Sequence, residues 1–110
     1  MNQTSEDSGT VTLINVFTVE PINQQRLIDL LSHATQGVVN RAPGFISSRL
    51  YRSTDGTKVT MFAQWRSAED YQVMRQDRRP LAFLEEALTF AKFEPGMYEL
   101  ARTFRPAGEI

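Results

Sequence analysis

The sequence contains no cysteine, and it contains a single histidine, His33. The lack of cysteine excludes disulfides, thiolate metal ligands, iron–sulfur clusters and a cysteine nucleophile. One imidazole excludes metal cages and motifs that need two histidines. A glycine-rich phosphate loop after a strand is also missing, because the pair Asp55-Gly56 is typical of a hairpin turn. The sequence therefore offers no motif for a metal or a phosphate-bearing cofactor.

The chain also lacks an excess of positive or negative charge. The chain has 12 Lys and Arg residues against 13 Asp and Glu residues, a formal net charge of −1, so no strong field favours nucleic acid or an anionic membrane. No apolar run approaches the roughly 20 residues that span a bilayer. Residues 1–10 have neither the basic start nor the apolar segment of a signal peptide. We expect a cytoplasmic protein without a nucleic-acid or membrane partner.

What is present is ordinary globular composition: 110 residues, of which 41% are hydrophobic, predict one domain. We expect this domain to cover residues 11–105, between a disordered tail at 1–10 and a short tail at 106–110. Alternation of side chains predicts four strands, at Val11–Glu20, Phe45–Arg52, Lys58–Arg66 and Met97–Arg105. Apolar residues at helical spacing predict helices over about 23–41, 68–76 and 81–91.

The predicted order is β-α-β-β-α-(α)-β, which is the ferredoxin-like arrangement of the α+β class. Helices cover one face of such a sheet, yet both faces carry apolar residues here. In the first strand, Leu13 and Phe17 oppose Ile14 and Val16. The second strand is predicted to do the same, with Phe45 and Tyr51 opposite Ile46 and Leu50. Because monomers avoid large bare apolar faces, we predict a homodimer in which two sheets form a barrel.

Two side chains are candidates for chemistry because of where they lie on the strands. Asn15 lies between Leu13 and Phe17 on one face, where an amide needs partners. It bonds to neighbouring backbone, or it points into an apolar cavity and holds a substrate oxygen. Trp65 ends the third strand and either packs in the core or donates its indole N–H to a ligand. Antiparallel pairing of these strands would place Asn15 and Trp65 on one face.

Further candidates are weaker. Tyr71 adds a phenol to the same space or simply packs. His33 lies on the polar stripe of the first helix and is interpreted as solvated and inert. The cluster Arg75, Arg78 and Arg79 is a solvated helix junction, or else it clamps an anionic substrate or guards a cavity mouth.

Four segments, in this order and spacing, resemble the antibiotic biosynthesis monooxygenase family. They are Leu13–Val19, Pro43-Gly44-Phe45, Ser53–Thr57, and Phe62–Ser67 with Tyr71. The likeness covers about residues 11–103. It implies a dimeric α+β barrel with a pocket between sheet and helices, and an enzyme that oxidises anthrones to quinones with O₂, without metal or flavin.

The resemblance also implies site residues. A strand-one Asn and a strand-three Trp of such members match Asn15 and Trp65, and a pocket Tyr matches Tyr71. Some members have an Asn where this chain has Met61. Haem-degrading relatives use a His on a later helix, and the predicted helix 81–91 has none, which argues against haem.

The sequence therefore predicts a monooxygenase that needs no cofactor and acts with O₂ on an electron-rich polycyclic phenol or anthrone. Asn15 and Trp65 are the predicted catalytic residues. The predicted substrate-binding residues are Leu13, Phe17, Met61 and Tyr71. A dimer that binds a small aromatic molecule without turning it over needs the same pocket, so the sequence does not separate it from the enzyme. A haem-binding relative is the third alternative.

Overall fold

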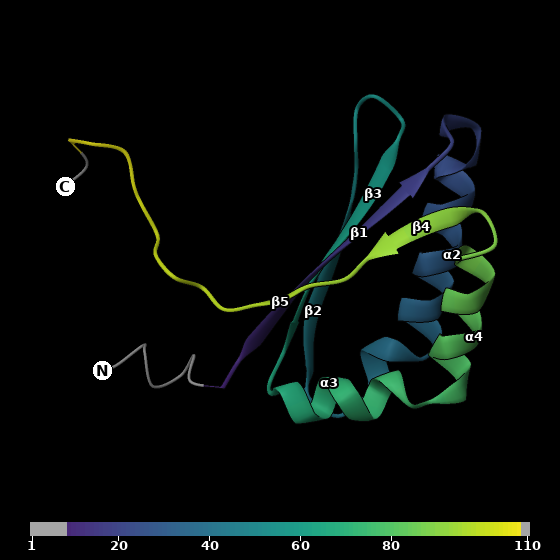
Figure 1. The fold of residues 1–110 in the computed structure, drawn as a ribbon. Coiled ribbons are helices and arrows are strands. Elements are labelled where there is room, and N and C mark those ends of the chain that lie inside the picture. Colours follow the sequence, from purple (N-terminus) through teal and green to yellow (C-terminus); the bar gives the residue numbers. More distant parts are fainter. Residues whose placement is uncertain (1–8, 109–110) are drawn as a thin grey trace.

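The structure is a computed structural model that describes residues 9–108; most of the predicted N-terminal tail, residues 1–8, lies outside it. An antiparallel sheet carries its helices on one face (Figure 1). The strands are β1 (Val11–Val19), β2 (Phe45–Arg52), β3 (Lys58–Trp65), β4 (Ala91–Glu94) and β5 (Met97–Tyr98). The helices are α2 (Gln24–Gly37), α3 (Ala68–Arg75) and α4 (Arg78–Ala87), with short 3₁₀ turns at Pro21–Asn23 and Val39–Arg41.

The strand order is β2-β3-β1-β4, with β5 also paired to β1, and every pair is antiparallel. This order confirms the predicted ferredoxin-like fold of the α+β class. Strand β1 therefore lies inside the sheet, between β3 on one side and β4 and β5 on the other. No helix within residues 9–108 is both long enough and apolar enough to cross a membrane.

The alternation predicted for β1 is confirmed by burial. Leu13, Asn15, Phe17 and Val19 are buried against the helices, whereas the residues between them are only partly buried. Phe17 stacks on Phe93 of β4 with ring centroids 4.8 Å apart. The face of β1 that bears Asn15 is therefore buried beneath the helices and forms part of the hydrophobic core.

Strand β2 departs from the prediction because of a bulge. One extra residue between Phe45 and Ser47 shifts the register, so that Phe45 pairs with Trp65 and Leu50 pairs with Met61. Phe45 and Leu50 thus share the helix-covered face, and the prediction that they oppose each other is wrong. A bulge reverses the alternation on either side of it, and nothing in the residue pattern reveals it.

The first helix is shorter than predicted. Helix α2 ends at Gly37, and residues 39–41 form a separate 3₁₀ turn. Its first residue, Gln24, is buried and donates from Nε2 to the carbonyls of Ser53 and Lys58, at 3.1 and 3.0 Å. These bonds attach the start of α2 to the hairpin between β2 and β3.

The C-terminal third was predicted correctly only in part. Helix α4 ends at Ala87, and Ala91 begins β4 instead of continuing the helix. The predicted strand Met97–Arg105 is reduced to Met97–Tyr98, and residues 99–106 form no strand. Glu94-Pro95-Gly96 does not reverse the chain but interrupts one edge strand, since β4 and β5 pair with β1 in the same register. Figure 1 shows the remaining segment running away from the domain.

Candidate functional site

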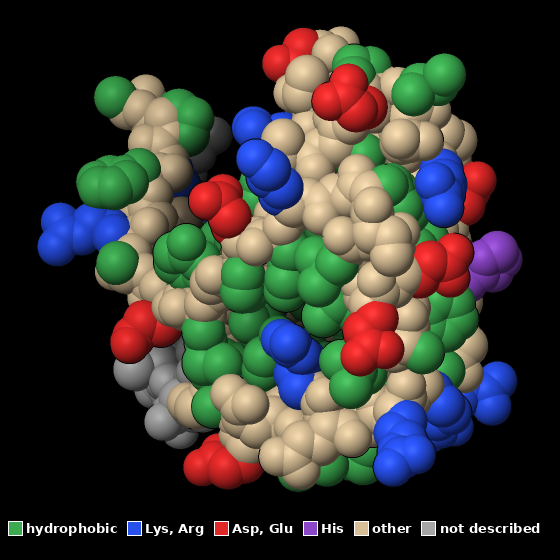
Figure 2. All heavy atoms as spheres, turned by 45° about the vertical axis from the view of Figure 1, so that its right-hand side comes forward, with side chains coloured by type: hydrophobic (Ala, Val, Ile, Leu, Met, Phe, Trp, Pro, Cys, Tyr) green, Lys and Arg blue, Asp and Glu red, His purple; other side chains and the backbone are tan. Residues whose placement is uncertain are grey.

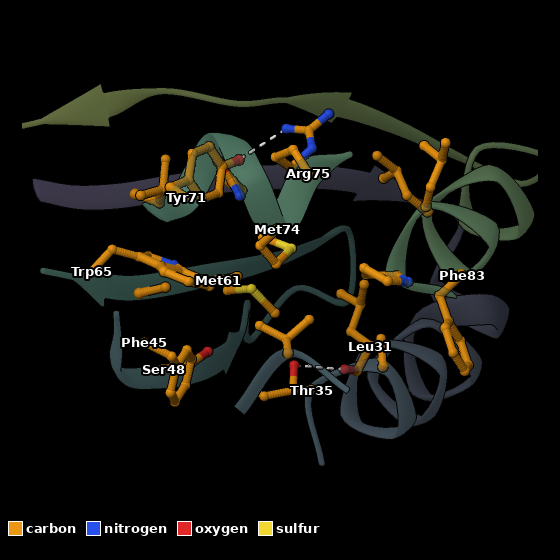
Figure 3. A pocket seen from close by; sticks show the side chains of 18 of the residues that line it. Leu31, Thr35, Phe45, Ser48, Met61, Trp65, Tyr71, Met74, Arg75 and Phe83 are labelled. Atoms are coloured by element: carbon orange, nitrogen blue, oxygen red, sulfur yellow. Dashed lines mark hydrogen bonds between the residues drawn. The ribbon is translucent and has the colours of Figure 1, made fainter. Parts of the chain in front are cut away.

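A pocket lies between the helix-covered face of the sheet and helices α2, α3 and α4 (Figure 3). The cavity has a volume of about 100 Å³, which is below the roughly 300–1,000 Å³ of typical small-molecule sites. Its lining is mostly apolar, and Figure 2 shows apolar side chains gathered around a hollow on this face. The pocket is therefore narrow, hydrophobic and open on one side.

Asn15 contributes a buried amide to this pocket, with 8% of the residue exposed. Its Oδ1 accepts a hydrogen bond of 3.3 Å from the backbone N–H of Gly96, at the break between β4 and β5. Since a backbone N–H needs an acceptor, this contact identifies the oxygen of the amide. The Nδ2 group has no partner within residues 9–108. The oxygen therefore bonds to backbone, as one of the two sequence-based interpretations has it, and the NH₂ group makes no hydrogen bond within residues 9–108.

Trp65 contributes a buried indole, with 1% of the residue exposed. Phe45 and Tyr71 meet it edge to face, with centroids 5.5 and 5.7 Å away. These contacts hold the ring in one orientation. Its Nε1–H has no acceptor within the described part of the chain. A buried indole N–H normally has a partner, so this group is available to a ligand.

The register of β1 against β3 sets the spacing of these two donors. Asn15 pairs with Met61, and Trp65 pairs with Val11, so both point to the same face but lie four residues apart along the strands. At about 3.3 Å per residue this is roughly 13 Å between their backbones. One ligand atom does not bridge them directly; an elongated ligand, such as a system of linearly fused rings, can.

Helix α3 brings a phenol and a cation to the pocket. Tyr71 is buried, and its hydroxyl accepts a hydrogen bond of 2.9 Å from Nη1 of Arg75, one helical turn later (Figure 3). The guanidinium carbon also lies 5.8 Å from the centroid of the Tyr71 ring. Arg75 is half-buried and lines the pocket.

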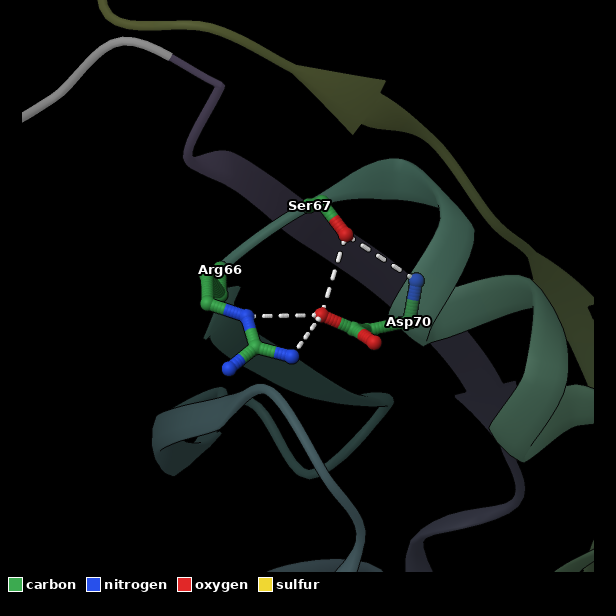
Figure 4. A network of polar contacts seen from close by, with 3 residues as sticks. All are labelled: Arg66, Ser67 and Asp70. Atoms are coloured by element: carbon green, nitrogen blue, oxygen red, sulfur yellow. Dashed lines mark hydrogen bonds and ion pairs between the residues drawn. The ribbon is translucent and has the colours of Figure 1, made fainter.

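A polar network holds the start of α3 in place (Figure 4). Ser67 is the N-cap of α3, and its Oγ accepts from the backbone N–H of Asp70 at 3.1 Å. Arg66 donates from Nε and Nη2 to Oδ2 of Asp70, at 2.9 and 2.8 Å. Gly44, in a left-handed conformation with φ of 88°, lies against the side chain of Asp70. The direction in which α3 leaves the sheet, and with it the position of Tyr71, depends on this network.

All six predicted site residues line this one pocket; they are Leu13, Asn15, Phe17, Met61, Trp65 and Tyr71. Lining residues that the prediction did not place there include Ser48, Met74 and Phe83. Arg75, whose cluster the sequence analysis considered for a cavity mouth or an anionic substrate, also lines the pocket. Ser48 reaches this face only because of the bulge in β2. His33 is exposed and does not line the pocket.

A second hollow, between α2, α3 and the start of α4, has a different character. Arg41, Asp70, Asp77 and Arg79 contribute to its lining. Asp77 caps α4, and Arg79 donates to it from the backbone and the side chain. These hydrogen bonds lower the pKa of Asp77 to about 2. Asp70, Asp77 and Arg79 are therefore paired within the protein, whereas Arg41 has no ion-pair partner within residues 9–108.

Comparison with known proteins gives one family and one curated relative. The family model described as antibiotic biosynthesis monooxygenase matches residues 10–86. The chain is 34% identical over 93 residues to the tetracenomycin-F1 monooxygenase of Streptomyces glaucescens. The aligned region covers 84% of this chain and 83% of that protein.

Solved structures show the same fold. The monooxygenase from the gene ActVA-Orf6 of Streptomyces coelicolor, in complex with the ligand nanaomycin D, has a TM-score of 0.79 at 24% identity, over 96% of this chain and 100% of that one. SnoaB, a cofactor-independent oxygenase from Streptomyces nogalater, has a TM-score of 0.72 at 20% identity, over 89% and 99% of the two chains. At these identities the likeness concerns the fold alone.

Proposed function

Because this chain belongs to the antibiotic biosynthesis monooxygenase family, as its sequence predicted, we propose that it oxidises a polycyclic anthrone or phenol of the polyketide type to a quinone with O₂, without metal or flavin. The main support is a pair of donors, Asn15 Nδ2 and Trp65 Nε1, whose buried side chains line one apolar pocket and which have no hydrogen-bond partner within residues 9–108. The curated relative is a monooxygenase named for a tetracenomycin, which agrees with a fused-ring substrate.

The substrate itself supplies the electrons in this reaction. Loss of a proton from the methylene carbon of an anthrone gives an enolate, which passes one electron to O₂. The carbon radical and superoxide then form a C–O bond, and the peroxide loses water as its O–O and C–H bonds break. One anthrone and one O₂ give one quinone and one water, so no external reductant is needed.

The protein has two tasks in this scheme. The lining contains no carboxylate or imidazole, so its contribution to ionisation is to stabilise the substrate anion with preorganised donors in a water-poor site. Asn15 Nδ2 bonds the enolate oxygen, and Trp65 orients the ring or the peroxide. Leu13, Phe17 and Met61 form apolar walls, and the flexible thioether of Met61 adapts to a flat ligand.

Oxygen uptake tests this proposal directly. Purified protein is mixed with dihydroxyanthrone in metal-free buffer with a chelator, and O₂ loss and quinone absorbance are followed together. We expect uptake well above the uncatalysed rate, with one O₂ consumed per quinone formed and no effect of the chelator. Uptake no faster than in the protein-free control, together with binding of the anthrone, would identify a binding protein instead of an oxygenase. Loss of activity with the chelator would contradict a metal-free reaction.

We also propose that the working form is a two-fold homodimer, because one chain leaves apolar surface bare. On the sheet face away from the helices, Ile14, Val16 and Phe62 remain partly accessible. Beyond β5 the chain continues without strand or helix, and it exposes 74% of Leu100 and 81% of Phe104. In this dimer a second copy packs its sheet against the bare sheet face, and the segment after β5 packs on that copy. Both apolar surfaces are then covered.

Sedimentation velocity at micromolar concentration tests the dimer. We expect a dimer for the unmodified protein and a shift towards monomer for the double variant Leu100→Asp/Phe104→Asp, since burial of one large apolar side chain contributes about 1.5–3 kcal/mol. Leu88→Asp, at an exposed leucine following α4, is the matched control and is expected to stay dimeric. A monomeric unmodified protein would refute the dimer.

A further inference from the structure

The pocket contains a single charged side chain, Arg75, and this charge has no carboxylate partner within residues 9–108. Its neighbours differ in this respect. Arg66 pairs with Asp70 at 2.8 Å, and Arg79 pairs with Asp77 at 2.7 Å. Arg66, just before α3, and Arg79, in the first turn of α4, thus have their own carboxylates, and the arginine that lines the pocket does not.

The surroundings of Arg75 favour a ligand over bulk water. A guanidinium has five N–H donors, and one bond, to the hydroxyl of Tyr71 at 2.9 Å, is made within the described residues. That bond and the contact with the Tyr71 ring orient the group over the pocket. The rest of the lining is neutral and mostly apolar. Beside such walls an ion pair is screened less than at an open surface.

We propose that Arg75 selects substrates that carry a carboxylate on the fused-ring system. This inference rests on the proposed function for the ring system and adds the anionic group. A carboxylate matches the planar donor fork of arginine and accepts two parallel N–H bonds. The enolate oxygen is assigned to Asn15 on β1, and the carboxylate to Arg75 on the last turn of α3. In this proposal Arg75 is a specificity-determining residue, with a role distinct from that of the donors assigned to the reacting end.

Fluorescence of Trp65 allows a binding test that does not depend on turnover, because it is the only tryptophan in the chain and it lines the pocket. The probes are anthraquinone carboxylic acid and its uncharged carboxamide, which differ little in size. We expect the full-length protein to bind the acid about tenfold or more tightly than the amide, as charge-assisted hydrogen bonds imply.

Variants then test whether Arg75 causes the preference for the acid. Arg75→Gln is expected to bind the two probes equally, and Arg75→Lys to keep part of the preference, because it retains the charge but loses the fork. Arg78→Gln is the matched control: this arginine is exposed, belongs to the same basic cluster and does not line the pocket. It is expected to behave as the unmodified protein. Thermal unfolding of each variant verifies the fold.

Two results would overturn the inference: no preference for the acid in the unmodified protein, or a preference that survives in Arg75→Gln. These outcomes are separate from failure of the proposed oxidation. If the protein prefers the acid through Arg75 but consumes no O₂, this inference stands and the proposed reaction is refuted. If the protein oxidises anthrones but binds acid and amide equally well, the proposed reaction stands and the role of Arg75 is refuted.

Discussion

Replacement of Asn15 by alanine separates a catalytic amide from a structural one. The side chain makes one hydrogen bond within residues 9–108, the 3.3 Å contact with the N–H of Gly96. A neutral hydrogen bond contributes about 0.5–1.5 kcal/mol, and one this long belongs at the lower end. We therefore expect a loss of less than about 1 kcal/mol in the free energy of unfolding, which lowers Tm by only a few degrees in a domain of this size.

The expected loss of activity is much larger. If Nδ2 stabilises charge that develops on the substrate oxygen, its removal costs about 3–4 kcal/mol of transition-state stabilisation. We expect kcat and kcat/KM to fall together by about 10²–10³, because the interaction is made mainly in the transition state. The measurement is O₂ uptake over a range of anthrone concentrations, with Tm measured on the same samples.

Thr35→Val is the matched control for Asn15→Ala. Thr35 also lines the pocket, but its hydroxyl donates its only hydrogen to the carbonyl of Leu31 at 2.9 Å. It is therefore not a free donor, and its removal is expected to leave turnover near that of the unmodified protein. If Asn15→Ala turned over as fast as Thr35→Val, the amide would have no place in the mechanism.

Three further predictions concern the indole, the start of α3 and the hairpin. Trp65→Phe keeps an aromatic ring but removes the unpartnered N–H, so kcat is expected to fall at least tenfold, by roughly the value of one donor; unchanged kcat would contradict the assignment. Gly44→Ala puts a Cβ at positive φ and against the side chain of Asp70, so we expect a loss of about 2 kcal/mol or more in urea unfolding, whereas Gly37→Ala, with open space around it, should cost nothing. Hydrogen bonds from Thr57 and Ser53 lower the pKa of Asp55 from 3.8 to about 2. The stability that this carboxylate adds is therefore complete above pH 4 and lost as the pH falls through 2, so the difference in Tm between the unmodified protein and Asp55→Asn should shrink over that interval.

Local sequence patterns were sufficient to predict a strand or turn where its residues followed the periodicity of that element. Alternation predicted β1, β2 and β3 to within one residue, and Asp55-Gly56 marked the hairpin between the last two. Alternation also placed Asn15 and Trp65 on the same face. These features depend on neighbours a few residues apart, which a sequence displays directly.

Where a segment depends on a distant partner, the sequence was misleading. Leu88 and Ala91 continue the apolar spacing of α4, but the chain leaves the helix at Ala87 because residues 91–94 pair with β1. Residues 99–105 have the composition of a strand but find no partner within the described chain. The bulge in β2 is decided by its pairing with β3.

By itself, the sequence determined the class of fold and the family, and it singled out the donors of Asn15 and Trp65 as candidates, because strand alternation and turns are local properties. Only the tertiary structure decided the distance between those donors, which follows from the register of β1 against β3. It also decided which of three neighbouring arginines reaches the pocket: Arg79 is held by Asp77, Arg78 is exposed, and Arg75 lines the site. Register and the packing of a helix over a sheet are contacts between segments remote in the chain, and no local pattern specifies them.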